Sequence, residues 1–133
     1  MRLLDRVMEL GAAVRYAALA HGADIAMRLR PDLKPGDGVT SSSESDRYEE
    51  LLVNPAILLL TQRRGEIDCG GLSHIIVGYG NFHQIVVPLN SGHLSVAIDK
   101  NADPTAFIAP LRRLIEIVGR APGAANSDIL KSA

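Results

Sequence analysis

The stretch RYEELLVNPAILLLTQRRG, residues 47–65, decides how this chain folds. On a helix of about 100° per residue its polar side chains form one narrow strip and the rest of the circumference is apolar; the strip is Arg47, Glu50, Asn54 and Thr61. A helix that lies on a single sheet needs an apolar stripe only somewhat wider than about 100°. We therefore expect a second cover over this helix, and in so short a chain we expect another subunit to supply it.

The two apolar sides of this helix have different expected neighbours. Residues at 3,4,4 spacing form the stripe that we expect to face a partner, namely Leu52, Ala56, Leu59 and Arg63. The residues expected to face the sheet are Val53, Ile57 and Leu60.

The ends of this helix are set by capping residues and by a proline. Asp46 followed by Glu49 has the spacing of an N-cap with a reciprocal acid, so the helix is predicted to open at Asp46 and to run to about Gly65. The residue before a proline avoids the helical region. The helix is therefore expected either to kink at Asn54 or to begin again there, with Pro55 in its first turn.

Alternating apolar residues predict five strands around this helix. Two of them precede it, at residues 14–20 and 24–30, joined by a turn at His21-Gly22. Three follow it as a meander, at residues 74–79, 82–89 and 93–100. A short amphipathic helix lies before the strands, and a last helix opens at Asp103-Pro104, bends near Pro110 and runs to Gly119. The chain is thus an α+β protein with the element order αββαβββα.

The sequence predicts one domain, over residues 1–120. Residues 31–46 contain two prolines, two glycines and four serines, which predicts an exposed, mobile loop. Residues 121–133 are polar and rich in small residues, which predicts a flexible tail.

Composition excludes several classes of function. With 47% hydrophobic and 22% charged residues the chain is globular, and a net charge of −1 implies no polyanionic partner. Aromatic residues make up only 4%, too few for a base-stacking platform, so nucleic-acid binding is disfavoured.

Charged residues interrupt the first ten positions, and the longest pure apolar run, Ala56 to Leu60, is far too short to span a bilayer. We expect a cytoplasmic protein, and its single cysteine, Cys69, fits that expectation.

The candidate chemical groups do not assemble into an active site at the level of sequence. No glycine-rich loop ends in the Lys-Ser/Thr pair of phosphate-binding loops, and the four histidines lack metal-ligand spacing. His74 and His83 are expected to be cross-strand neighbours on a half-solvated face. The paired acids Glu49-Glu50 and Asp99 with Asp103 are interpreted as helix-start and solvated carboxylates. We expect no catalytic residue, no cofactor site and no metal site.

Two segments resemble the roadblock/dynein light chain 7 family, and the likeness extends over about residues 3–118. They are NPAILLLTQRRGEIDCGGLSHIIV, residues 54–77, and GHLSVAIDKNADP, residues 92–104. The resemblance implies a five-stranded antiparallel sheet sandwiched by helices, with the second helix on one face and the terminal helices on the other. It also implies a homodimer or heterodimer in which second helices pack side by side and third strands pair. The residues expected at that interface are Leu52, Ala56, Leu59, Arg63, Ile75 and Val77.

Three functions follow, from different classes. The resemblance implies a non-catalytic, dimerising regulatory scaffold that binds and modulates a Ras-like small GTPase or a partner roadblock-like chain. The alternative is a small-ligand sensor domain of profilin-like architecture, which predicts a persistent pocket between sheet and helix. A third interpretation is a hydrolase that uses Cys69 as nucleophile and His74 as base.

Overall fold

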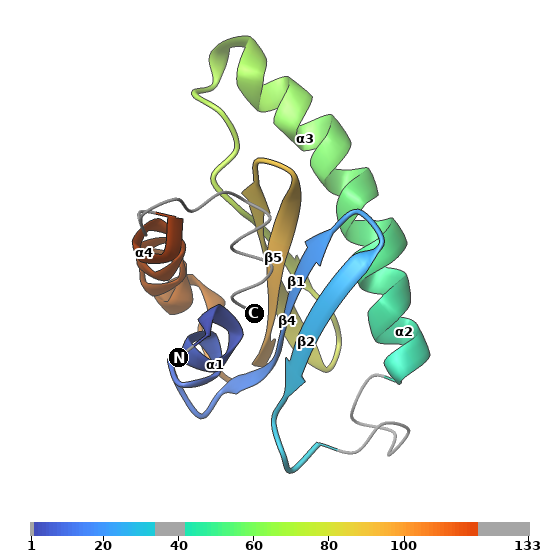
Figure 1. Cartoon of the computed structure of the whole chain (residues 1–133), viewed down its shortest axis with the longest axis vertical. Coiled ribbons are helices and arrows are strands. Elements are labelled where there is room, and N and C mark those ends of the chain that lie inside the picture. Colours follow the sequence, from blue (N-terminus) through green and yellow to red (C-terminus); the bar gives the residue numbers. More distant parts are fainter. Residues whose placement is uncertain (1, 34–41, 120–133) are drawn as a thin grey trace.

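The computed structural model describes residues 2–33 and 42–119 of the chain. The predicted tail, residues 121–133, and residues 34–41 of the predicted loop lie outside them. The elements, in chain order, are α1 (Leu3–Met8), β1 (Val14–His21), β2 (Asp24–Leu29), α2 (Ser43–Tyr48), η1 (Glu49–Val53), α3 (Asn54–Asp68), β3 (Ile75–Gly78), β4 (Phe82–Leu89), β5 (Gly92–Asp99), η2 (Pro104–Phe107) and α4 (Ile108–Gly119) (Figure 1).

The five strands form one antiparallel sheet, in the order β2-β1-β5-β4-β3. β5 lies at the centre, so that Val96 pairs with Ala17 on one side and with Ile85 on the other. All five strands lie within one residue of the bounds predicted from the alternation of apolar side chains. The predicted α+β class and five-stranded sheet are confirmed.

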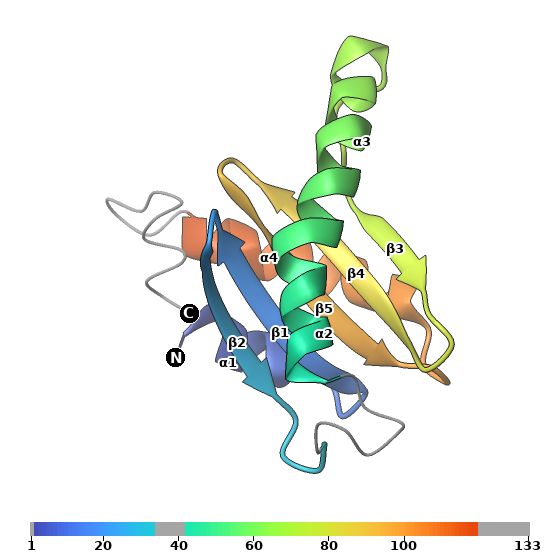
Figure 2. The same ribbon diagram turned by 90° about the vertical axis from the view of Figure 1, so that its right-hand side faces the viewer.

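Helices cover both faces of this sheet. α1 and α4 lie on one face, and the long helix made of α2, η1 and α3 crosses the other (Figures 1 and 2). The main core lies on the α1/α4 side and is built from aliphatic side chains, including Leu4, Val7, Leu19, Ile85, Leu94, Val96, Ile98 and Leu111. A smaller apolar cluster around Tyr16, Ala18 and Ala97 lies on the other face. The sheet is thus sandwiched between helices, as predicted.

The long helix begins earlier than its sequence predicts. Its N-cap is Ser42, whose hydroxyl accepts a hydrogen bond from the Ser45 backbone N–H at 3.0 Å, so the prediction of a start at Asp46 is wrong. The last residues of the predicted loop 31–46 are therefore helical. The helix also ends later than Gly65, at Asp68.

A π-helical turn, η1, lies just before the proline of this helix and accommodates it. Asn54 has helical dihedral angles, φ −62° and ψ −46°, so the helix does not begin again there. Its N–H donates to the Glu49 carbonyl oxygen, five residues back. Pro55 has no backbone N–H and cannot donate a hydrogen bond to a carbonyl oxygen of the preceding turn. The wider π-helical turn accommodates this missing hydrogen bond. The extra residue in the turn shifts the angular position of every side chain that follows.

The last helix opens through a 3₁₀ turn, η2. Asp103 caps it, because its Oδ1 accepts hydrogen bonds from the Thr105 N–H at 3.0 Å and from the Thr105 hydroxyl at 2.6 Å. Pro110 lies in the first turn of α4, where a proline is tolerated. The bend expected near Pro110 stays a prediction, and the change from 3₁₀ to α geometry lies just before that residue, at Ile108.

We predict that Gly92 is required where β5 begins, because a Cβ at this position would lie 1.9 Å from the Ala20 carbonyl oxygen. Gly92→Ala must push β1 and β5 apart, which we expect to cost about 2 kcal/mol or more and to lower the Tm by about 8 °C. Thermal denaturation followed by circular dichroism measures this. The matched control is Gly80→Ala, because a Cβ there meets nothing within 4 Å. Equal melting temperatures for the two variants would contradict the packing described here.

Candidate functional site

The long helix turns its polar side toward the sheet and much of its apolar side toward solvent. Glu50 and Asn54 are fully buried, whereas Leu59 and Leu60 are 54% and 70% exposed. The interpretation of Glu49-Glu50 as solvated carboxylates is wrong, and so is the prediction that Leu60 faces the sheet. Val53 and Ile57, the other residues expected there, are half-buried.

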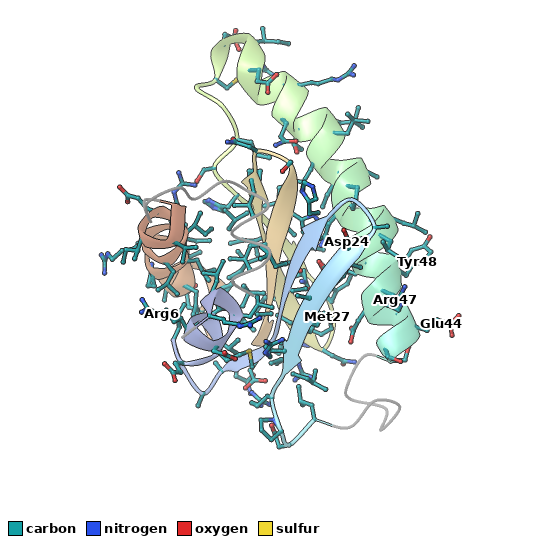
Figure 3. All side chains as sticks on the ribbon, in the orientation of Figure 1. Arg6, Asp24, Met27, Glu44, Arg47 and Tyr48 are labelled. Atoms are coloured by element: carbon teal, nitrogen blue, oxygen red, sulfur yellow. The ribbon has the colours of Figure 1, made fainter. Side chains whose placement is uncertain are left out.

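The four residues of the predicted polar strip differ in burial. Arg47 precedes the turn and is exposed, and Glu44 points away from the sheet (Figure 3). Glu50 and Asn54 lie against the sheet, while Thr61 is exposed and donates its hydroxyl hydrogen to the Ile57 carbonyl oxygen at 2.6 Å. Asn54 and Thr61 lie on the same side of α3, and they differ in burial because the C-terminal half of α3 extends beyond the sheet (Figure 2).

The Glu50 carboxylate is the centre of a buried polar network. The network consists of Tyr16 on β1, Glu50 and Asn54 on the helix, Gln84 on β4, and His93 and Ser95 on β5. Ser95 Oγ lies 2.5 and 2.6 Å from the two Glu50 oxygens, and His93 Nε2 lies 2.9 Å from Glu50 Oε1. Asn54 Nδ2 donates to the same carboxylate at 3.1 and 3.2 Å. Three elements of the fold are thereby tied to one buried carboxylate.

Tyr16 extends this network to the neighbouring strand. Its hydroxyl donates to Gln84 Oε1 at 3.0 Å and lies 3.4 Å from Glu50 Oε2. Burial raises the pKa of Tyr16, and the negative charge of Glu50 raises it further. The phenol therefore stays protonated and serves as a hydrogen-bond donor in this network.

The residues predicted to face a partner lie on the outer side of the long helix. Leu52, Ala56, Leu59 and Arg63, which we call the outward stripe, are all exposed. Other apolar side chains of the same helix are also exposed, with Tyr48 at 61% and Ile67 at 74%. The C-terminal half of α3 extends beyond the sheet (Figure 2). That a partner covers the outward stripe remains a prediction.

The other two predicted interface residues lie on the edge strand β3. Within the described part of the chain β3 pairs only with β4, so its second edge is open. Ile76 packs against the core on the α1/α4 side. Because side chains alternate along a strand, Ile75 and Val77 lie on the opposite face, the one crossed by the long helix, and both are half-buried. The open edge of β3 and the outward stripe are thus the two surfaces where the resemblance implies pairing.

The candidate chemical groups lie apart from one another. Cys69 is exposed, its Sγ lying 3.3 Å from Arg64 Nη1 and 3.2 Å from Asp68 Oδ1, whereas the His74 ring lies 2.9 Å from the Ser73 hydroxyl. The nucleophile and base of the hydrolase interpretation thus have different hydrogen-bond partners.

His83 pairs with Gly78 across β3 and β4, so the prediction that His74 and His83 are cross-strand neighbours is wrong. Among residues 2–33 and 42–119, no three His, Cys, Asp or Glu side chains are grouped as a metal site would need. Over the same residues, no helix is both long enough and apolar enough to cross a bilayer.

The acids near the end of β5 have separate roles. Asp103 is a helix-start residue, as predicted, because it caps η2. Asp99 is instead held by two arginines, with Arg15 Nη1 3.1 Å from Oδ1 and Arg30 Nη1 2.8 Å from Oδ2. Partial burial opposes ionisation, but the hydrogen bonds from Arg30 and Arg15 outweigh it and lower the pKa of Asp99.

Sequence reasoning missed most of the buried network. The signal was present as two patterns that belong together: Glu50 and Asn54 four residues apart on the helix, and His93 and Ser95 two residues apart on β5. Both patterns put polar residues on one face of an element. Matching the polar face of the helix to the polar face of the strand would have located the contact.

The fold is shared with a solved roadblock/LC7 domain and with solved MglB structures. A roadblock/LC7 domain from Streptomyces avermitilis matches with a TM-score of 0.62 and 15% sequence identity, over 87% of this chain and 91% of that one. The gliding protein MglB from Thermus thermophilus matches with a TM-score of 0.63 and 16% identity, over 98% of this chain and 87% of MglB. Another MglB structure, in a tetrameric arrangement, matches with a TM-score of 0.63 and 15% sequence identity, over 89% of this chain and 83% of that one.

No family model and no curated protein matches this chain. At 15–16% identity the structural matches establish a common fold. The roadblock resemblance inferred from residues 54–77 and 92–104 is confirmed at that level.

We predict that Glu50→Ala lowers the free energy of unfolding by about 3 kcal/mol or more, because it leaves His93, Ser95 and Asn54 buried without their shared acceptor. Urea denaturation measures the change. Glu44→Ala, an exposed acid on the same helix, is the control and should change stability by no more than about 0.5 kcal/mol. If Glu50→Ala does not fold, Ser95→Ala should still destabilise by about 1 kcal/mol. Equal effects for Glu50→Ala and Glu44→Ala would contradict the network.

Proposed function

We propose that this chain is a non-catalytic, dimerising regulatory scaffold whose partner is a Ras-like small GTPase or another roadblock-like chain. One observation carries the proposal: the outward stripe of the long helix is exposed on the same side of a sheet whose edge strand β3 is open. Such a scaffold acts by binding and contributes no catalytic group of its own. As a partner of a small GTPase it would work in the cytoplasm.

The exposed apolar side chains support a protein interface on the helix. Leu52, Leu59, Leu60 and Ile67 are each more than half exposed, and all lie on one continuous helix. Soluble proteins rarely leave large contiguous apolar patches in water unless the patch binds something. A second copy of the same helix offers a matching apolar surface, and a two-fold axis would bring the two together.

The edge of β3 supports the same arrangement. An open strand edge presents unpaired backbone N–H and C=O groups and is a template for pairing with another strand. If β3 pairs with its counterpart in a partner, the two sheets become one and Ile75 and Val77 approach the joint. The helix contact and the strand contact then reinforce each other in one interface.

The comparisons support assembly with similar chains. One of the structures with this fold is an MglB in a tetrameric arrangement. The proposal that the partner is a small GTPase rests on the roadblock resemblance. A scaffold influences a GTPase by binding one of its conformations more tightly than the other.

A second candidate function, the small-ligand sensor, is favoured by one observation. A groove of about 480 Å³ lies between the start of the long helix and the turn that joins β3 to β4. It has the location that the sensor interpretation predicts. A sensor would show a ligand-induced rise in Tm in the absence of any partner protein.

We predict that Leu59→Glu dissociates the dimer while helical content stays unchanged. A charge left unpaired in an interface costs about 3 kcal/mol or more, so dimerisation should weaken by at least about 100-fold. Sedimentation equilibrium gives the mass, and circular dichroism gives the helical content. Ile117→Glu on α4, where an exposed isoleucine lies on the other face of the sheet, is the control and should remain dimeric. A Leu59→Glu variant that dimerises as tightly as the control would mean that the outward stripe is misassigned.

The partner itself is identified by affinity capture from native extract, run once with a GTP analogue and once with GDP. We expect a Ras-like GTPase or a roadblock-like chain to be retained, and the GTPase to be retained in only one nucleotide state. A monomeric bait that retains no protein in either state would overturn the scaffold proposal and favour the sensor.

A further inference from the structure

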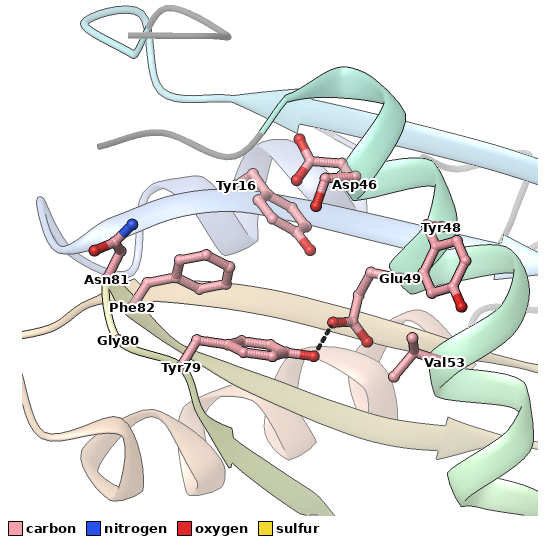
Figure 4. A pocket seen from close by; sticks show the side chains of 10 residues that line it. Tyr16, Asp46, Tyr48, Glu49, Val53, Tyr79, Gly80, Asn81 and Phe82 are labelled. Atoms are coloured by element: carbon pink, nitrogen blue, oxygen red, sulfur yellow. Dashed lines mark hydrogen bonds between the residues drawn. The ribbon is translucent and has the colours of Figure 1, made fainter. Parts of the chain in front are cut away.

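The groove beside the start of the long helix has an aromatic wall. Four of the five aromatic residues in the chain line it, namely Tyr16, Tyr48, Tyr79 and Phe82. The Tyr79 and Phe82 rings are tilted with their centroids 5.3 Å apart, and Tyr48 closes the side formed by the helix (Figure 4). Aromatic faces carry partial negative charge and attract cations within about 6 Å of the ring centroid.

The same groove has an acidic side, formed by Asp46 and Glu49. The Glu49 side chain points between Tyr48 and Tyr79, and its Oε1 accepts a hydrogen bond from the Tyr79 hydroxyl at 2.6 Å (Figure 4). Its Oε2 is buried and has no hydrogen-bond partner among the described residues, and Glu49 as a whole is only 7% exposed. A buried acceptor without a donor is costly, so this oxygen is suited to a ligand that brings an N–H group.

The charges around Glu49 favour a positive ligand. Burial raises the pKa of Glu49, and the nearby carboxylates of Glu50 and Asp46 raise it further, while the Tyr79 hydrogen bond and His93 oppose that rise. A cation bound here would relieve both the burial cost and the repulsion among the acids. Burial and the same bond to Glu49 raise the pKa of Tyr79 to about 12, so the phenol stays a donor.

Arg15, beside the aromatic wall of this groove, is held by an acid outside it. The Arg15 guanidinium lies 5.6 Å from the centroid of the Phe82 ring, but it bonds to Asp99 at 3.1 Å. Arg47, although close in sequence, is not among the residues that line the groove.

We propose that this groove binds an organic cation, an alkylammonium or guanidinium group, whose N–H donates to Glu49 Oε2 while its alkyl chain packs on Tyr48 and Tyr79. An anion would be repelled by the two carboxylates, and a purely apolar ligand would leave Oε2 unpartnered. None of the lining residues belongs to the outward stripe, so the inference does not depend on the proposed dimer.

The test uses the full chain and three probes that differ in charge and source. Agmatine is a free cation with a guanidinium and an ammonium group. N-acetylarginine amide represents an arginine side chain of a protein, and N-acetylcitrulline amide has the shape of the arginine compound without the charge. Binding is followed by NMR titration of backbone amides around the groove. We expect at least one of the two guanidinium probes to bind at least about tenfold more tightly than the citrulline compound. Binding of agmatine but not of the arginine compound would identify a free cation as the ligand. Binding of the arginine compound would identify a side chain of a partner.

Two variants locate the binding in this groove. Glu49→Gln keeps the shape and removes the charge, and we expect it to weaken binding at least about tenfold, whereas Glu44→Gln on the exposed side of α2 should bind as the unaltered chain does. Tyr48→Ala, which removes an exposed ring, should also weaken binding. This second variant tests the groove even if Glu49→Gln does not fold. Citrulline binding as tight as that of both guanidinium probes, or full affinity in both Glu49→Gln and Tyr48→Ala, would overturn the proposal.

Discussion

The Glu50 carboxylate is the contact on which the arrangement of the long helix depends. It lies fully buried between the helix and the sheet, and it accepts hydrogen bonds from both sides of that layer. A helix held to a sheet by aliphatic packing can rotate by small amounts and find other contacts. Here, rotation would leave a buried carboxylate without donors, which costs several kcal/mol. The network therefore fixes which side of the helix faces outward.

The outward apolar surface follows from this contact and from the π-helical turn. Asn54 is turned toward His93 and Glu50, with its Nδ2 3.3 Å from His93 Nε2, and Leu58, one turn later, is buried as well. Because these positions occupy the inner face, Leu52, Leu59 and Leu60 point outward. Polar packing within the chain thus leaves apolar surface exposed, which is the property that the proposed dimerising scaffold needs.

Sequence alone predicted the order of the elements, the strand bounds and the excess of apolar surface on the second helix, because each depends on local periodicity. It failed where a contact joins residues distant in sequence. Glu49 and Glu50 look like ordinary acids near a helix start, and only their approach to Tyr79, His93 and Ser95 shows that they are buried. The error at Leu60 comes from the same contact, because the helix turns the side of Asn54 toward the sheet and Leu60 lies on another side of the regular helix α3. The aromatic groove was missed because Tyr16, Tyr48, Tyr79 and Phe82 come from separate elements.

The most direct test of this account measures which side of the helix faces solvent. In a Cys69→Ser background, Leu58→Cys and Leu59→Cys place a thiol at adjacent positions that are 5% and 54% exposed, and the rate of reaction with a thiol reagent is measured in dilute protein. The account predicts that Leu59→Cys reacts much faster than Leu58→Cys, and that its rate falls as protein concentration rises and the stripe becomes covered. A Leu58→Cys thiol that reacts as fast as the one at Leu59→Cys would contradict the inward polar and outward apolar arrangement of the helix.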